Sequence, residues 1–395
     1  MWNADIRSRC ERNMILENER IRKSNIELLR IISMLLIISH HYVVNSEIMN
    51  AFQIGDTSIN YIFLNLWGMW GKTCINTFIL ITGYFTCKTG PTIKRYCKIL
   101  LEYLFYHFVI YFIMLAAGYE TIGFKRVFDL FFVVFRFANR SGYFTYSFLI
   151  FYLFIPFINK FIQSITKYDM RKVVLLLLFV FTIQSTFFFN YYIFGEVFWF
   201  IAVYFIGAYL SLYPPEWSCN LKGSVRLLIM SLVLSYSSVL LMIFVGAMTQ
   251  KADPYIFVAD SNKLGAVLVS VMLFSTFKNL NIGYSKAINL MAKTTFGVLM
   301  IHANSDAWRK FMWVDLLHVN TFYSLPIISL IMRSILIVAG IFIICSLIDL
   351  IRIFLIEKPV FDRFDQIERL VKKAYEHAAH IGHSIYTGII RIAER

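Results

Sequence analysis

The chain alternates between long apolar runs and short polar connections. Ten apolar runs approach the length needed to cross a hydrocarbon core, about 20 residues. They cover residues 26–44, 67–87, 97–118, 143–162, 172–190, 194–213, 224–247, 263–279, 288–304 and 327–354. Because each run can form a membrane-spanning helix, the pattern predicts an all-α polytopic membrane protein, a bundle of about ten transmembrane helices.

The remaining segments predict the parts that flank this bundle. Residues 127–138, "VFDLFFVVFRFA", are short and charged, and we expect an interfacial or re-entrant piece. Residues 1–25 are charged throughout, lack the apolar core of a signal peptide, and predict a cytoplasmic tail. Residues 26–356 form the predicted membrane domain. Residues 357–395 are polar with an apolar helical face, which predicts an amphipathic tail on the inner leaflet.

Composition and charge support this organisation. The chain is 58% hydrophobic and 16% charged, whereas soluble proteins are roughly 45–50% apolar and about 25% charged. With the amino terminus in the cytoplasm, most of the 38 Lys and Arg residues fall in cytoplasmic connections and tails. Both termini are therefore expected in the cytoplasm. The net charge of +14 then needs no nucleic acid, and the predicted partner is the lipid bilayer.

No metal site is predicted. The six cysteines are scattered, without the spacing of zinc ligands. His377, His380 and His383 recur every three residues in the carboxyl-terminal tail, but no carboxylate or cysteine completes a ligand set. A solvated helix face is the favoured interpretation of these three histidines.

The first span carries ionisable side chains at both ends. In "LLRIISMLLIISHHYVV" (28–44), eleven residues separate Arg30 from His41. In a helix this interval places both on one face, about 16 Å apart, while His40 points about 100° away from His41. An ionisable group at bilayer depth costs about 2.5–3.5 kcal/mol and is a candidate for function. The alternative is that Arg30 extends to the inner headgroups and the histidines are solvated at the outer interface.

The first span also resembles a known family. "NIELLRIISMLLIISHHY" is similar to the first helix of the acyltransferase 3 family, integral membrane enzymes that commonly O-acetylate surface glycans. The resemblance covers about residues 24–358, and the further motifs follow in the family's order: "GKTCINTFILITGYF" (71–85), "KRYCKILLEYLFY" (94–106), "YFTYSFLIFYLFIPFINKFI" (143–162), "FWFIAVYFIGAYL" (198–210) and "TTFGVLMIHAN" (294–304). One departure is Lys98, where the family's Arg-x-x-Arg pair has a second arginine. The charge is kept, but the bidentate fork is lost.

The resemblance implies an O-acetyltransferase that moves an acetyl group from cytoplasmic acetyl-CoA to a hydroxyl of a surface polysaccharide or its lipid-linked precursor. It also implies a bacterial plasma membrane. A histidine suits the removal of the hydroxyl proton at neutral pH, so His41 is the predicted base, and an acyl-histidine route stays open. His302 is predicted either to orient substrate or to pack.

The donor is expected to be held by basic residues. Lys94, Arg95 and Lys98 precede or enter the third span, where they could hold the phosphates of acetyl-CoA; ordinary inner-face charge is the alternative. Arg30 is predicted to bind phosphate or the pantetheine arm.

Other residues and functions are weaker candidates. Glu102 is expected to pair with Lys98, and His107 to be structural. Asn76, Thr82 and Gly83 could line the path between the first two spans or serve packing. The main rival function is a transporter or flippase for a polysaccharide precursor, and a glycan polymerase is a further alternative. The sequence shows neither the paired halves of many transporters nor the large outer loop expected of a polymerase. It leaves the acceptor sugar and the oligomeric state open.

Overall fold

The computed structural model of the 395-residue chain describes residues 23–121, 143–188 and 195–364. Within these ranges the regular structure is helical and contains no strand, which confirms the expected all-α class. The α-helices are α2 (Ser24–Val44), α3 (Ile59–Gly68), α4 (Gly71–Thr89), α5 (Ile93–Ala116), α7 (Tyr143–Ser164), α8 (Lys167–Leu177), α9 (Gln184–Phe187), α10 (Glu196–Leu212), α11 (Glu216–Cys219), α12 (Leu221–Thr249), α13 (Leu264–Asn279), α14 (Lys286–Lys293), α15 (Thr295–His302), α16 (Asp306–Lys310) and α17 (Ile327–Arg352).

Five shorter helical turns complete the described structure: the 3₁₀ turns η1 (Ile48–Ala51) and η5 (Val319–Ser324), and the π-helical turns η3 (Leu178–Ile183), η4 (Phe311–Leu316) and η6 (Ile353–Glu357). The predicted segment 127–138 and the histidines of the carboxyl-terminal tail lie outside the described residues.

The chain divides into two compact units, residues 1–346 and residues 347–395. In the second unit, Arg352 forms ion pairs with Asp349 (Nε to Oδ1, 2.7 Å) and Glu357 (Nη1 to Oε2, 2.9 Å). All candidate site residues of the described chain belong to the first unit.

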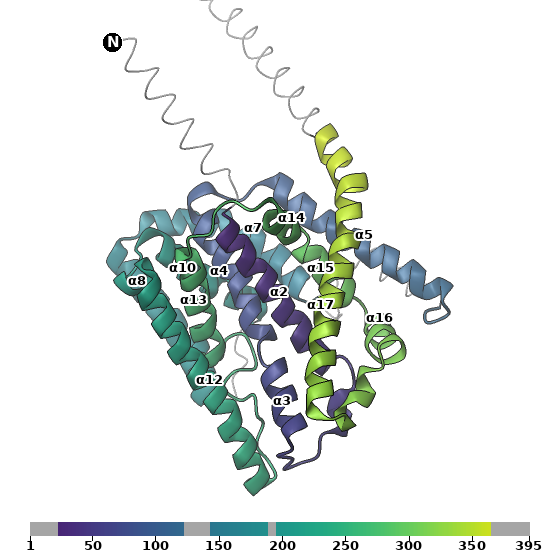
Figure 1. The fold of residues 1–395 in the computed structure, drawn as a ribbon. Helices are drawn as coiled ribbons and strands as arrows, with labels where there is room; N and C mark the ends of the chain where they lie inside the picture. The colour runs from purple at the N-terminus through teal and green to yellow at the C-terminus, as the bar shows by residue number, and fades with distance from the viewer. Residues whose placement is uncertain (1–22, 122–142, 189–194, 365–395) are drawn as a thin grey trace, which may run out of the picture. The chain divides into compact units, whose positions relative to one another are not determined.

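Helix α2 lies among several other helices of the first unit. It contacts α3, α4, α13, α14 and α15, and Figure 1 shows it in purple beside α4 and α13. The segment Ser24–Val44 contains neither Gly nor Pro, and Glu27 stands in its first turn, where a carboxylate complements the helix dipole. The helix is unbroken from Arg30 to His41, so the predicted separation of about 16 Å follows from helix geometry.

Two apolar clusters hold the first unit together. One joins α4, α7, α10 and α13 around fully buried residues such as Phe151, Phe200 and Tyr204. The other joins α2, α5, α15 and the first part of α17, with Trp313 and Tyr42 at its centre. Their rings meet edge to face, with centroids 6.0 Å apart. Because α2 and α4 pack directly against each other, they bring the two clusters together.

Six described helices are long and apolar enough to cross a membrane: Ser24–Val44, Ile93–Ala116, Phe144–Ser164, Lys167–Phe187, Leu221–Thr249 and Ile327–Phe364. Glu196–Leu212 and Leu264–Asn279 are shorter apolar helices. On α12, large apolar side chains such as Met230, Leu241 and Phe244 are more than half exposed. A water-soluble surface rarely carries such a face, whereas lipid matches it. These observations support a multi-pass membrane protein.

Two predicted spans differ in detail from the helices. The run 67–87 begins in the last turn of α3, turns at Met69 and Trp70, and continues as α4, which is more polar than the six candidate spans. The run 288–304 is divided into α14 and α15. The division falls at Thr294, whose hydroxyl donates to the Met291 carbonyl at 2.7 Å and also lies 2.9 Å from the Ser346 hydroxyl.

Candidate active site

Two histidines from distant parts of the sequence meet inside the first unit. His41 lies in the last turn of α2, and His302 is the last residue of α15. The Nδ1 atom of His41 is 2.9 Å from the Nε2 atom of His302. His302 is fully buried, whereas His41 is half-buried. The arrangement therefore joins a fixed inner imidazole to an outer one that other groups can still reach.

The hydrogen bonds of this pair define its tautomers. The Nδ1 atom of His302 lies 2.6 Å from the Val298 carbonyl oxygen, which can only accept. A neutral His302 therefore carries its proton on Nδ1, and its Nε2 accepts from the Nδ1–H of His41. The same logic leaves Nε2 of His41 without a proton. This nitrogen can act as a base, oriented by the imidazole behind it.

The neighbouring His40 has a different partner. Its Nδ1 lies 2.6 Å from the Gly68 carbonyl oxygen, at the end of α3. The Ser39 hydroxyl donates to the preceding carbonyl, that of Trp67. His40 therefore anchors α2 to α3, a helix that the sequence analysis did not predict. Its ring centre lies 5.7 Å from that of His41, and its hydrogen bond goes to α3 rather than to the His41–His302 pair.

Glycine at position 71 makes room for His40. A Cβ atom at Gly71, the first residue of α4, would overlap with the His40 ring. The start of α4 is thereby brought against α2, and Lys72, the next residue, comes within electrostatic range of His41. Lys72 also acts on the carboxylate of Glu196 at the start of α10.

A second cation near His41 comes from α16. Arg309 in α16 acts electrostatically on His41. Its Nη1 donates to the Asn45 side-chain oxygen at 3.4 Å, and its other terminal nitrogen pairs with Asp306. Sequence reasoning missed Lys72 and Arg309. The signal for Arg309 was weak, since only its closeness in sequence to His302 could have suggested it.

The predicted donor-binding residues lie away from the histidine pair, in the first part of α2 and at the start of α5. Arg30 is half-buried, and its Nε is 3.7 Å from Oε1 of Glu27. Lys94, Arg95 and Lys98 occupy the first two turns of α5, where Lys94 is half-buried and the other two are exposed. The Thr92 hydroxyl caps this helix by accepting from the Arg95 backbone N–H. None of these residues is adjacent to the histidine pair; the helix axis separates Arg30 from His41 by about 16 Å.

Asn76, Thr82 and Gly83, the weaker candidates on α4, make contacts that hold helices and loops together. The Asn76 amide donates to the Ser261 carbonyl at 2.6 Å and accepts from the Trp199 indole at 2.9 Å. The Thr82 hydroxyl donates to the Phe78 carbonyl, four residues earlier in α4. Gly83 packs against the backbone of Tyr204 in α10 rather than facing α2.

Two side chains of α5 complete this set. His107 lies beside the Tyr103 ring, as a structural role predicts. Glu102 is buried, and its pairing with Lys98 stays a prediction. Across residues 23–121, 143–188 and 195–364, no group of three His, Cys, Asp or Glu side chains could hold a metal ion.

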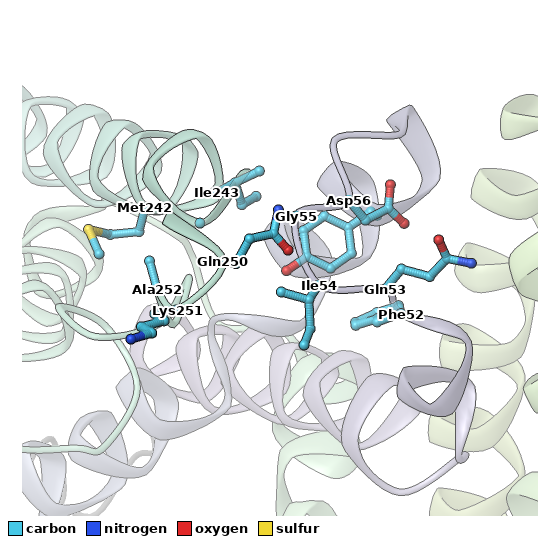
Figure 2. Close-up of a pocket in the computed structure, with 12 residues that line it drawn as sticks. Phe52, Gln53, Ile54, Gly55, Asp56, Met242, Ile243, Gln250, Lys251 and Ala252 are labelled. Atoms are coloured by element: carbon cyan, nitrogen blue, oxygen red, sulfur yellow. The ribbon is translucent and has the colours of Figure 1, made fainter. Parts of the chain in front are cut away.

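A separate pocket opens between the connection that follows η1 and the end of α12 (Figure 2). Its volume is about 330 Å³, and Phe52, Asp56, Gln250 and Lys251 are among the residues that line it. None of the predicted site residues lines this pocket. Helix α3 connects the two places, because its first half borders the pocket and its last carbonyl binds His40.

Comparison with known proteins agrees with this arrangement. A family model described as an acyltransferase domain matches residues 23–350, which include the helices that carry Arg30, His41 and His302. No curated protein and no solved structure matches the chain. The family match covers most of the sequence and agrees with the resemblance of the first helix. The chain belongs to the acyltransferase 3 family and is a membrane acyltransferase.

Proposed function

We propose that the chain is an O-acetyltransferase that transfers an acetyl group from cytoplasmic acetyl-CoA to a hydroxyl of a cell-surface polysaccharide or its lipid-linked precursor. The observation that carries the proposal is the bond between His41 and His302, which leaves Nε2 of His41 as an oriented base. Family membership supplies the reaction class.

The chemistry requires two proton transfers, one to His41 and one from it, and the exchange of a C–S bond for a C–O bond. The acceptor hydroxyl gives its proton to Nε2 of His41 as its oxygen attacks the thioester carbonyl. The new C–O bond forms, the C–S bond breaks, and the sulfur leaves with the proton that His41 returns. Lys72 and Arg309 both act electrostatically on His41, and such cations can stabilise the negative charge of the tetrahedral intermediate. An acyl-histidine route would use the same nitrogen.

The amino-terminal end of α5 supports the assignment of the donor phosphates. Lys94, Arg95 and Lys98 stand in its first two turns, and the first turn contains no acidic residue. The helix dipole is positive at this end and attracts an anion. The backbone N–H groups of the same turn also favour an anion. The phosphates of acetyl-CoA meet this requirement.

Arg30 links the two ends of the proposed path. Its distance from His41, about 16 Å along α2, is comparable to an extended pantetheine arm. A donor whose phosphates stay at the cytoplasmic end could therefore present its thioester to His41. This path needs the proposed orientation, with both termini in the cytoplasm. About ten spans and a bacterial plasma membrane are proposed together with it.

The central test uses the full chain in liposomes with acetyl-CoA and acceptor glycan. We expect release of CoA and formation of a glycan ester, and we expect both to disappear in His41→Ala. A carrier would instead move glycan without consuming acetyl-CoA. Transport of glycan by the parent without any ester formation would overturn the proposal.

The donor assignment has its own test. Arg95→Ala combined with Lys98→Ala should weaken the binding of labelled acetyl-CoA, while Lys167→Ala, at the start of α8, should not. Equal binding by the parent and the double variant would show that these two residues do not hold the phosphates.

A further inference from the structure

Two lysines from different helices gather on one tyrosine ring. Lys88 lies in the last turn of α4, and Lys278 in the last turn of α13. Their ammonium nitrogens are 6.0 Å and 5.9 Å from the centre of the Tyr84 ring. The two charges are therefore no more than about 12 Å apart. The Tyr84 ring is itself held against the buried Phe274, with centroids 5.2 Å apart.

This grouping leaves an excess of positive charge. In the described part of the chain, neither Lys88 nor Lys278 forms an ion pair with a carboxylate. A lysine near a helix end is favoured by the dipole, and an aromatic face attracts an ammonium group. These effects explain one lysine at each helix end. They leave two ammonium groups near one ring without a carboxylate partner among the described residues, and an anion can bind to such a pair.

The cluster lies at the end of the molecule where the proposed donor enters. The Asn25 amide, in the first turn of α2, donates to the carbonyls of Lys278 at 3.1 Å and Leu280 at 3.0 Å. Lys278 is therefore fixed next to the end of α2 that carries Arg30. Lys88 lies close to the start of α5, because only the four residues Thr89 to Thr92 separate it from Ile93.

We propose that Lys88 and Lys278, positioned by Tyr84, bind a phosphate group of the acyl donor. Each ammonium group offers three donors to phosphate oxygens. Tyr84 acts by holding the two lysines, not by contacting the reacting atoms. The inference rests on the proposed function, since it assigns further residues to the same donor. Phosphate is also the chemistry of lipid headgroups, so the test separates the two sources.

The test measures binding by the full chain in nanodiscs of neutral phosphatidylcholine. CoA is titrated against the parent and against Lys88→Ala combined with Lys278→Ala. We expect Kd for CoA to rise about tenfold or more, as for the loss of charge-assisted hydrogen bonds. The KM of acetyl-pantetheine, which has no phosphate, should not change. Lys172→Ala is the matched control, because Lys172 lies 4.2 Å from the centre of the Tyr168 ring on a single helix, and no second lysine of the described residues lies over that ring.

Further variants keep the result interpretable. The double exchange of both lysines for arginine should retain CoA binding, because it keeps both charges. Equal CoA affinity of the parent and the alanine variant overturns this inference alone. A second titration measures the binding of phosphatidylglycerol added to the same nanodiscs. If the alanine variant loses only this binding, the lysines hold lipid headgroups and the inference is also wrong. A parent that binds no CoA at all would instead overturn the donor on which the proposed function rests.

Discussion

The imidazoles of His41 and His302 are hydrogen-bonded through Nδ1 and Nε2 at 2.9 Å, although 261 residues separate them in sequence. The inner ring is fixed in turn by the Val298 carbonyl, at 2.6 Å from Nδ1 of His302. The chain of bonds runs from a helix backbone through a buried ring to a half-buried one. Under the proposed function the two histidines have different roles, His41 as base and His302 as positioning residue, and these roles can be tested separately.

Replacing His41 by alanine should abolish acyl transfer without unfolding the protein. General-base catalysis contributes about 10²- to 10⁴-fold to a rate, and we expect kcat to fall by that factor. The measurement is CoA release in the presence of acceptor glycan, with thermal unfolding as the control for folding. His40→Ala is a useful comparison, because it removes the anchor to Gly68 and should lower stability more than chemistry. A His41→Ala enzyme with full turnover would exclude His41 as the base.

Replacing His302 should act through His41. His302→Leu removes the acceptor for the Nδ1–H of His41, so the base loses its orientation and kcat should fall about tenfold or more while KM changes little. His302→Gln can return an acceptor oxygen and should restore part of the rate. A residue that merely filled the core would show no such rescue, since leucine fills the space as well as glutamine does.

The position of His41 on α2 could be predicted from the sequence, whereas the residues that surround it could not. The interval between Arg30 and His41 fixes their common face as soon as the segment is helical, and α2 is unbroken. Sequence reasoning could name His302 but could not choose between a substrate-orienting and a packed residue, because the choice depends on how α15 meets α2. Lys72 and Arg309 were missed because tertiary contacts, not local pattern, bring them toward His41.

The roles of small and polar residues in α4 also depend on tertiary contacts that the local sequence pattern does not show. The stretch that contains Asn76 and Gly83 was compatible with a path between helices or with packing, and periodicity could not decide. Both residues contact α10, Asn76 through Trp199 and Gly83 through Tyr204, and Asn76 also binds the Ser261 carbonyl. The division of the run 288–304 into α14 and α15 could not be predicted either. It falls at Thr294, whose hydroxyl contacts Ser346 on another helix.

Gly71→Ala should disrupt the junction of α2 and α4. The new Cβ would overlap with the His40 ring, so the ring or the start of α4 has to move. Overpacking of this kind costs about 1–3 kcal/mol, and we expect a lower Tm together with reduced activity. Gly340→Ala in α17 is the matched control, because no atom lies within 4 Å of its added Cβ and alanine favours helix. Equal Tm values for the two variants would contradict this account of Gly71.

The contact between Asp56 and Tyr323 predicts a pH-dependent stability. Burial by itself raises the pKa of Asp56, but hydrogen bonds from Tyr323 and Ser58 outweigh it, and the pKa lies below its ordinary value. A carboxylate with a lowered pKa stabilises the folded state at neutral pH, and this contribution is lost as the pH falls through the lowered value. Tm should therefore hold above about pH 5 and fall below about pH 4.

Tyr323→Phe separates this contribution from other acid effects. The variant lacks the hydroxyl that binds Asp56, so it should have a lower Tm at neutral pH and a smaller further decrease on acidification. Tyr284→Phe, at an exposed position, serves as the control. Identical acid profiles for the parent and Tyr323→Phe would show that this pair does not contribute.

The contact between α4 and α10 makes the sharpest stability prediction, because the atoms that would clash are backbone. A Cβ at Gly83 would lie 2.6 Å from the Tyr204 carbonyl oxygen, and a Cβ at Gly207 would lie 2.6 Å from the Leu80 carbonyl oxygen. Neither carbonyl can rotate away as a side chain would, so the helices must separate. Small residues at such crossings let helix backbones approach closely in membranes.

We therefore expect Gly83→Ala and Gly207→Ala each to destabilise the protein by about 1–3 kcal/mol. Separation caused by the first substitution makes room for the second, so the double variant should lose less than the sum of the two single losses. Thermal unfolding of the three variants beside Gly340→Ala measures this coupling. Strictly additive losses would mean that the two glycines do not share one crossing.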